Sequence, residues 1–230
     1  MKKEIKVPFF VFWEVHGSFD SEEFIGRNFS DKMYGKGGDD KMWGHGGDDY
    51  IDGGEGIDAL IGGTGNDTLH GQYGRDFLYG VAGNDHLWGG WANDFLDGGE
   101  GDDYLWGDDG NDELQGGSGN DELVGGRGND VLAAGAGNDT LEGGRGIDTI
   151  TGGLGNDEFT LSEGAGHAII TDFNSGDDII PIEWNWRLGT NIAGDTTILE
   201  GDDLLAVLQG VKNNQIIKHT WGGRLIFDGI

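Results

Sequence analysis

The chain has no cysteine, only two prolines among its 230 residues, and 14 basic residues against 43 acidic ones. Without cysteine, neither a disulfide framework nor a thiolate metal site can form. The shortage of basic residues leaves a formal net charge of −29, so nucleic acids and anionic membrane surfaces are not expected partners. No segment approaches the ~18 consecutive apolar residues of a membrane helix, and no membrane span is predicted.

Glycine is abundant, with 49 residues, and it recurs with a period of nine. Fifteen nonapeptides run from Gly26 to Thr160 without an insertion, as in GGTGNDTLH at 62–70 and GGSGNDELV at 116–124. Position 6 is Asp and position 8 is apolar in all fifteen units. Such regularity excludes a disordered glycine-rich linker and indicates a repeat architecture.

Each position in the unit has a physical role. Glycine at positions 1, 2 and 4 is expected to allow positive φ and tight turns, and Asn or Asp at position 5 tolerates the left-handed region. Positions 7 to 9 then predict a three-residue strand. Because alternate strand residues face opposite sides, position 8 points inward while positions 7 and 9 point outward.

A loop and a short strand in nine residues make half a turn of a coil. The sequence therefore predicts an all-β fold, a parallel β-roll in which two units complete each turn. Strands in each of its two sheets stack ~4.8 Å apart, and a column of loops follows each edge. Loops of units n and n+2 lie one above the other in the same column.

This stacking brings the position-6 carboxylates together. Two bare carboxylates ~4.8 Å apart repel by roughly 3 kcal/mol at an effective dielectric constant near 20. A Ca²⁺ ion between the loops would reverse this, since it prefers six to eight carboxylate and carbonyl oxygens, whereas Mg²⁺ demands a tighter octahedron and Zn²⁺ prefers His and Cys. The candidate metal ligands are Asp40, Asp49, Asp58, Asp67, Asp76, Asp85, Asp94, Asp103, Asp112, Asp121, Asp130, Asp139, Asp148 and Asp157.

The number of calcium ions follows from the two columns. Eight loops in one column and seven in the other leave up to thirteen gaps. The degenerate first unit and the substitutions Ile57, Ala92 and Ile147 lower the expected number to about ten. Folding should be coupled to calcium binding, with a threshold on the order of 10⁻⁴–10⁻³ M, as in extracellular modules.

The repeat GGxGxDxUx resembles the RTX (repeats-in-toxin, hemolysin-type) nonapeptide, a known calcium-binding β-helix motif. The resemblance covers residues 26–160 and extends to ITDFNSGDDIIPI at 170–182, which is similar to the segment that follows RTX repeats. It implies a type I secreted protein, located outside the cell or on its surface, with an uncleaved C-terminal signal.

The flanks of the roll are expected to be β-rich. Residues 1–25 contain an aromatic run that predicts an N-terminal capping strand. Residues 161–230 alternate apolar and polar residues in short runs and predict a C-terminal cap that covers the open end of the roll and contains the secretion signal. Asp172, Asp177 and Asp178 are expected either to add a calcium site at the junction or to form a turn.

The outward positions 7 and 9 contain many aromatic residues, and three explanations are open. The flanks could cover them, or they could form a surface for self-association or a partner, or they could stack against a glycan, for instance at Trp43, Trp88 and Trp106. One sheet should present Tyr50, His70, His86, Trp88, Tyr104 and Trp106, and the other Trp43, Ile61, Phe77, Tyr79 and Phe95.

No catalytic signature is present: the sequence has neither HExxH nor GxSxG. The chain is therefore not expected to be an enzyme. Two functions fit, a secreted calcium-binding protein with a structural or interaction role in a surface layer, matrix or adhesion, or an RTX module accessory to a secreted polysaccharide-active enzyme. The start at Met1 and the lack of an interdomain linker favour the first.

Overall fold

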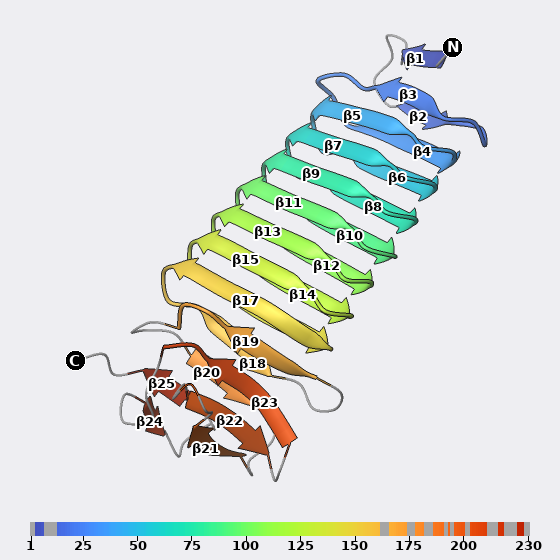
Figure 1. The fold of residues 1–230 in the computed structure, drawn as a ribbon. Coiled ribbons are helices and arrows are strands. Elements are labelled where there is room, and N and C mark those ends of the chain that lie inside the picture. Colours follow the sequence, from blue (N-terminus) through green and yellow to red (C-terminus); the bar gives the residue numbers. More distant parts are fainter. Residues whose placement is uncertain are drawn as a thin grey trace.

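A computed structural model describes residues 3–6, 13–161, 166–173, 178–181, 186–190, 193, 196–200, 203–210, 216–218 and 225–227. Every regular element in these residues is a β-strand, and the strands stack into an elongated roll (Figure 1). No helix in the described part of the chain has the length and apolar character to cross a membrane.

Fifteen strands, one per nonapeptide, form the body of the roll. They are β4 (Asp31–Gly37), β5 (Lys41–Gly46), β6 (Tyr50–Glu55), β7 (Ala59–Thr64), β8 (Thr68–Tyr73), β9 (Phe77–Ala82), β10 (His86–Trp91), β11 (Phe95–Glu100), β12 (Tyr104–Asp109), β13 (Glu113–Ser118), β14 (Glu122–Arg127), β15 (Val131–Ala136), β16 (Thr140–Arg145), β17 (Ile147–Leu154) and β18 (Glu158–Leu161).

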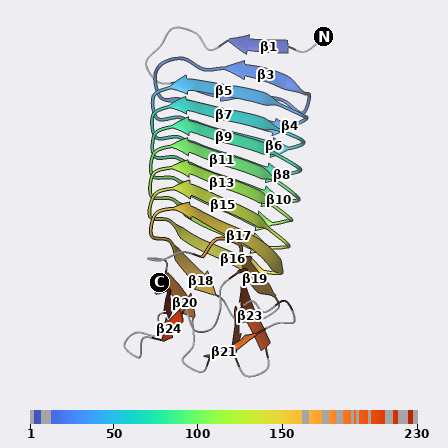
Figure 2. The ribbon, with the colours of Figure 1, turned by 60° about the vertical axis from the view of Figure 1, so that its left-hand side comes forward.

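Shorter strands continue the stack at both ends (Figure 2). Those before the body are β1 (Lys3–Lys6), β2 (Trp13–His16) and β3 (Glu22–Ile25). Those after it are β19 (His167–Ile170), β20 (Asp178–Pro181), β21 (Trp186–Thr190), β22 (Thr196–Glu200), β23 (Asp203–Leu208), β24 (Ile216–Lys218) and β25 (Leu225–Phe227).

The described strands form two sheets, which we call sheet A and sheet B. Sheet A has thirteen strands in the order β1-β3-β5-β7-β9-β11-β13-β15-β17-β19-β23-β22-β21, and sheet B has twelve in the order β2-β4-β6-β8-β10-β12-β14-β16-β18-β20-β25-β24. Pairing is parallel throughout the body, as between β10 and β12, and becomes antiparallel among the last strands. The predicted all-β parallel roll is confirmed.

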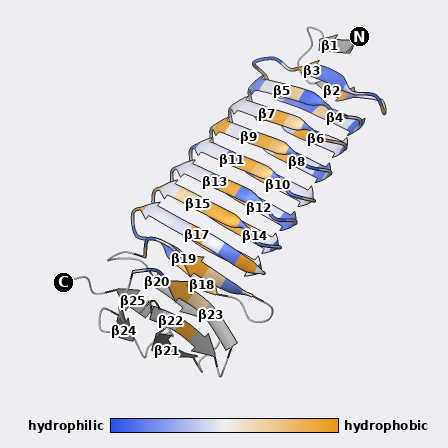
Figure 3. Ribbon diagram, in the orientation of Figure 1, coloured by the Kyte–Doolittle hydropathy of each residue, from blue (hydrophilic) through white to orange (hydrophobic). Residues whose placement is uncertain are grey.

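Position 8 of every unit lies in the core. The side chains from Met33 to Phe159 at this position are fully buried between the sheets, and Phe24 extends the row toward the N-terminus. Hydrophobic residues recur at the same place in successive strands (Figure 3). Each rung adds one large apolar side chain to a thin core, so the roll gains its apolar burial rung by rung.

The prediction of three-residue strands was wrong. The strands of the body are mostly six residues long and continue through positions 1 to 3 of the next unit, as in β10. The glycine of position 1 explains this, because it does not have positive φ, whereas the glycines of positions 2 and 4, except Gly110, do. Because the backbone stays extended at position 1, the strand and its hydrogen bonds continue past the apolar residue of position 8 as far as the next loop.

Val81 occupies position 2 with a φ of 89°, a strained conformation for a β-branched residue. We expect Val81→Gly to stabilise the calcium-loaded roll by about 1 kcal/mol, because the strain exceeds the entropy that glycine loses on folding. Val131, 48% exposed against 46% for Val81, has no positive φ, so Val131→Gly should destabilise it. Urea unfolding midpoints measure the stability of both variants. A loss of stability in Val81→Gly would show that the backbone at Val81 is not strained.

Candidate metal sites

The position-6 aspartates form two columns, one on each edge of the roll. The first column contains Asp31, Asp49, Asp67, Asp85, Asp103, Asp121, Asp139 and Asp157, and the second contains Asp40, Asp58, Asp76, Asp94, Asp112, Asp130 and Asp148. All fifteen side chains are buried, with at most 3% of each residue exposed. Sequence reasoning had placed them in the loops but had not anticipated such complete burial.

One oxygen of each carboxylate is held by the backbone. The N–H of Asp85 donates to Oδ1 of Asp103 at 2.8 Å, and the N–H of Asp103 donates to Oδ1 of Asp121 at 2.9 Å. The same bond joins residues 18 apart along both columns, from Asp40 to Asp157. A carboxylate fixed in this way keeps its second oxygen in one place.

The second oxygen, Oδ2, points into the protein and is without a hydrogen-bond partner in most units. A buried oxygen with no partner costs free energy, and more so when it carries charge. A cation at this oxygen would remove the cost. The aspartates concerned are Asp49, Asp58, Asp67, Asp76, Asp85, Asp94, Asp103, Asp112, Asp121, Asp130 and Asp139.

The glycine of position 1 keeps the space around Oδ2 open. A Cβ built on Gly80 would overlap Oδ2 of Asp85 and approach the carbonyl oxygen of Gly98 in the next rung, and Gly89 lies in the same way against Asp94 and Gly107. Carboxylate and carbonyl oxygens therefore share a pocket that a side chain would fill. This is the physical reason for glycine at position 1, in place of the positive φ expected from the sequence.

This donor set suits a hard cation. In the part of the chain that the structure describes, no group of three His, Cys, Asp or Glu side chains could hold a metal ion. A metal between the loops would therefore depend on one carboxylate per loop together with backbone carbonyls. Oxygen-only coordination fits Ca²⁺, whereas Zn²⁺ selects nitrogen and sulfur ligands.

Burial raises the pKa of these carboxylates, because it disfavours the charged form. The pKa rises to about 8 for Asp49 and Asp94. It rises to about 7 for Asp58, Asp67, Asp103 and Asp130, and to about 6 for Asp76, Asp85, Asp112, Asp121 and Asp139. Without a cation, many of these groups would fold only with a proton attached.

This predicts how the metal-free fold depends on pH. The folded pKa values lie above the ordinary value of 3.8 and reach about 8, so between these limits the folded chain binds more protons than the unfolded chain. In chelator the fold should therefore lose stability as the pH rises through this window and be most stable below it. Circular dichroism in chelator measures this, and a metal-free fold that becomes more stable with rising pH would contradict it. The calcium-loaded chain, in which protons compete with calcium, should show the opposite trend.

The structure reveals a further unit that the sequence reasoning missed, at residues 17–25. Gly17 takes position 1, Glu22 takes position 6 and the buried Phe24 takes position 8. The N–H of Glu22 donates to Oδ1 of Asp40 at 2.7 Å, so Glu22 is the first carboxylate of the second column. Gly17 and Phe24 at the repeat spacing could have signalled this unit, but Glu in place of Asp hid it.

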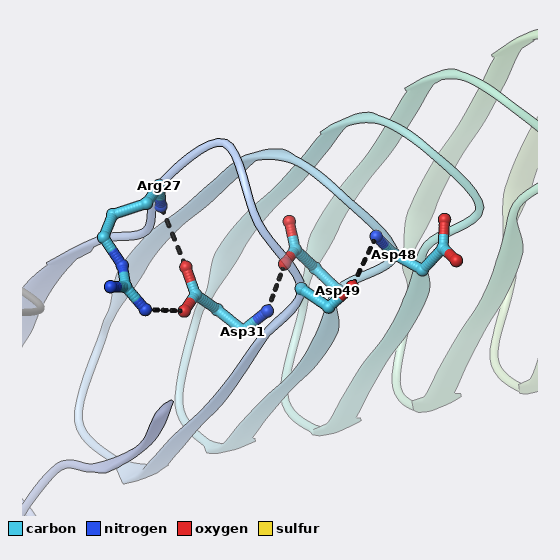
Figure 4. A network of polar contacts seen from close by, with 5 residues as sticks. Arg27, Asp31, Asp48 and Asp49 are labelled. Atoms are coloured by element: carbon cyan, nitrogen blue, oxygen red, sulfur yellow. Dashed lines mark hydrogen bonds and ion pairs between the residues drawn. The ribbon is translucent and has the colours of Figure 1, made fainter. Parts of the chain in front are cut away.

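The first carboxylate of each column is satisfied by the protein itself. Asp31 accepts the backbone N–H of Arg27 on Oδ2 and a guanidinium N–H of Arg27 on Oδ1, each at 2.9 Å (Figure 4). Glu22 accepts the N–H of Ser18 at 2.7 Å and its hydroxyl at 3.2 Å. Arg27 and Ser18 both occupy position 2, so the N-terminal carboxylates are bound by donors of their own units.

At the other end, Asp172 accepts the N–H groups of Gly152 at 2.9 Å and Gly153 at 2.8 Å. Both of its oxygens therefore bind backbone, which favours the turn-forming role over a junction calcium site. Asp177 and the side chain of Asp178, the other candidates there, lie outside the described residues.

Two of the loop substitutions expected to lower the calcium number, Ile57 and Ile147, keep the backbone donor of the loop's hydrogen bonds, but their side chains offer no acceptor to the next rung. The N–H of Ile57 donates to Asp39 and that of Ile147 donates to Asn129, as the Asn residues of position 5 do in other units. The number of ions stays a prediction.

The outward aromatic residues are divided between the sheets as expected. Trp88 and Trp106 are neighbours in register on β10 and β12 of sheet B, while Trp43 lies on β5 of sheet A. Ring contacts run from His16 and Tyr34, stacked at 4.8 Å, to Tyr104 and Trp106 at 6.0 Å. Described residues 13–25 continue the two sheets at their ends (Figure 1), so in this segment the flank extends the aromatic row.

A protein-family model matches the repeats of the chain. The model of the RTX calcium-binding nonapeptide repeat (4 copies) matches residues 25–60, 53–87, 61–96, 70–105, 97–132, 106–141 and 134–167. Together these ranges cover more than half of the chain and include all the candidate aspartates. No curated protein matches the chain as a relative.

Proposed function

Because the chain belongs to the family of RTX calcium-binding nonapeptide repeat proteins, we propose that it is a secreted calcium-dependent β-roll with a structural or interaction role outside the cell. The observation that carries the proposal is the row of buried Oδ2 atoms without partners in both columns. Bound calcium would supply the positive charge that these oxygens lack.

The chain's own residues would prepare the sites. The position-6 aspartates donate one carboxylate oxygen each, the Oδ1 ladder fixes their orientation, and the position-1 glycines leave carbonyl oxygens accessible. We propose about eleven ions, one for each described aspartate with an unpartnered Oδ2, within the range of ten to thirteen expected from the repeats.

Secretion through a type I system is part of the proposal and rests on the RTX family. In a calcium-poor cytosol the chain would stay unfolded and could be exported, and calcium outside would then fold it. We propose that residues 161–230 contain the export signal. The coupling predicts a folding threshold on the order of 10⁻⁴–10⁻³ M calcium.

A second candidate function is favoured by the aromatic row on sheet B. According to this second candidate, the roll is an accessory module of a secreted polysaccharide-active enzyme and binds an extracellular glycan. In either case the proposal assigns the chain no reaction of its own, since its buried carboxylates serve as metal ligands.

A calcium titration followed by far-ultraviolet circular dichroism and sedimentation tests the proposal. The chain should be expanded and unstructured in chelator at neutral pH and become compact with β-signal near the extracellular calcium concentration. Magnesium at the same concentration is the control and should not fold it. A chain that is fully folded in chelator at neutral pH would refute the proposal.

A further inference from the structure

The outer surface of sheet B contains a groove that the calcium sites do not use. It has a volume of about 840 Å³, within the ~300–1,000 Å³ range of small-molecule sites. Apart from Gln72 of β8, its lining residues come from β10, β12, β14 and β16, so it runs parallel to the stacking axis. Four strands at ~4.8 Å spacing give it a length of roughly 14 Å.

The repeat explains how the groove is built. Its floor includes the position-2 glycines Gly90, Gly126 and Gly144, which have no side chains to fill the space. Tyr104 and Trp106 of β12 line it from positions 7 and 9. The other wall consists of position-3 residues that are neighbours in register along the sheet, namely Trp91, Asp109, Arg127 and Arg145.

The fold itself does not require these large residues. The same position 3 on sheet A, at the same level of the roll, holds Ala82, Glu100, Ser118 and Ala136. Mostly small side chains there leave no second wall. The bulky and charged wall of sheet B is therefore a feature of this sequence and not of the β-roll.

The groove offers flat aromatic faces and polar groups together. Trp91 is 48% and Trp106 is 37% exposed, and Tyr73 supports Trp91 from the next rung at a ring-centroid distance of 4.1 Å. Arg127 forms an exposed ion pair with Asp109 at 3.2 Å, which is weak enough to exchange for ligand hydroxyls. Glu122 and Glu142 line the same groove as acceptors.

The charges decide which kind of ligand fits. Asp108, Asp109, Glu122 and Glu142 face only two guanidiniums, so the groove has a net charge of −2 on a chain of −29. A polyuronate or a second copy of this chain would be repelled. A polylysine-like peptide would be repelled by Arg127 and Arg145 at one end of the groove. A neutral polyhydroxylated chain can donate hydroxyls to the carboxylates, accept from the arginines and place its apolar ring faces on the tryptophans.

We propose that this groove binds an uncharged linear oligosaccharide along the roll axis, with Trp91 and Trp106 as stacking platforms and Arg127, Glu122 and Glu142 as hydrogen-bonding groups. This inference rests on the proposed interaction role outside the cell and specifies its partner as a neutral glycan. It excludes the acidic glycans that a cationic surface would recruit.

Isothermal titration calorimetry of the calcium-loaded full chain tests this, with cellohexaose as the neutral probe and an oligogalacturonate as the acidic one. Cellohexaose should bind, and Trp106→Ala should weaken its binding about tenfold, since aromatic contacts of this kind contribute on the order of that factor. The acidic probe should not bind. Trp43→Ala is the matched control, because Trp43 occupies the same position 9 on sheet A.

Circular dichroism in calcium, recorded on the same samples, keeps the two proposals separate. A folded chain that does not bind cellohexaose refutes the groove and leaves the calcium roll intact, and so does an equal effect of Trp43→Ala and Trp106→Ala. Binding of the oligogalacturonate, of a lysine-rich peptide or of a second chain in sedimentation in place of the neutral probe also refutes it.

Discussion

Asp103→Asn is expected to raise the calcium concentration needed for folding and to destabilise the calcium-loaded roll by about 3 kcal/mol. Asn keeps an oxygen that can accept the N–H of Asp85, which lies 2.8 Å from Oδ1 of Asp103. The substitution therefore preserves the hydrogen-bond ladder and changes only the buried, unpartnered Oδ2. The loss of stability in calcium therefore measures the contribution of Oδ2 of Asp103 to calcium binding.

Without calcium the same substitution should act in the opposite direction. Burial raises the pKa of Asp103 to about 7, so above this pH the folded metal-free chain carries a buried charge that Asn removes. The metal-free chain folds only as the pH falls, so in chelator we expect Asp103→Asn to leave the pH midpoint of folding unchanged or to shift it upward. In calcium we expect it to destabilise the fold. A substitution that destabilises equally in both conditions would show that the carboxylate is structural.

The first column provides its own control. Asp31 is bound by the guanidinium and the backbone N–H of Arg27. Its contribution to stability should therefore not depend on calcium. Asp31→Asn should lower stability by the same amount at every calcium concentration that folds the chain. The double variant of Asp103 and Asp121, neighbours in the column, should show the strongest calcium dependence. Urea titrations at several calcium concentrations measure these differences, and equal responses would contradict the two-column arrangement.

Gly128→Ala is expected to destabilise the roll by about 3 kcal/mol or more, through the backbone and not through the metal. Gly128 has a φ of 141°, and a Cβ there would overlap the carbonyl oxygen of Gly110 in the rung before it. The chain does contain an alanine at this position of the repeat, Ala92, but with a φ of 86°. Because Gly128 lies farther from the left-handed region, the substitution must move the whole loop.

Gly210→Ala is the matched control for this effect. Gly210 also has positive φ, 76°, but a Cβ there would meet nothing within 4 Å. It should cost about 1 kcal/mol, the usual penalty of an L-residue in the left-handed region. Thermal unfolding in saturating calcium compares the two variants, and similar losses would mean that the close approach of successive rungs does not limit the loops.

The sequence was sufficient for the architecture because its strongest signal is a period. The apolar residue of position 8 and the Asp of position 6 recur without exception, and one stacking arrangement places all of them consistently. The roll, its two sheets and the inward direction of position 8 could therefore be predicted. The assignment of outward aromatics to the two sheets followed from the same phase.

Other features depend on contacts that a period does not contain. The position-1 glycine was explained by φ, whereas the structure shows that it gives space to the Asp side chain of its own unit. The unit at 17–25 was missed because Glu22 replaces Asp, although its N–H joins the same ladder. The groove on sheet B depends on which position-3 side chains meet across rungs, and this becomes visible only when residues 18 apart are placed side by side.

The central claim is that calcium completes the buried aspartates of the two columns. Equilibrium dialysis of the full chain against calcium, followed by elemental analysis, measures the number of ions directly. We predict about eleven calcium ions per folded chain, one for each described aspartate with an unpartnered Oδ2, and a reduced number in the double variant of Asp103 and Asp121. A folded chain that retains few or no calcium ions would contradict the account.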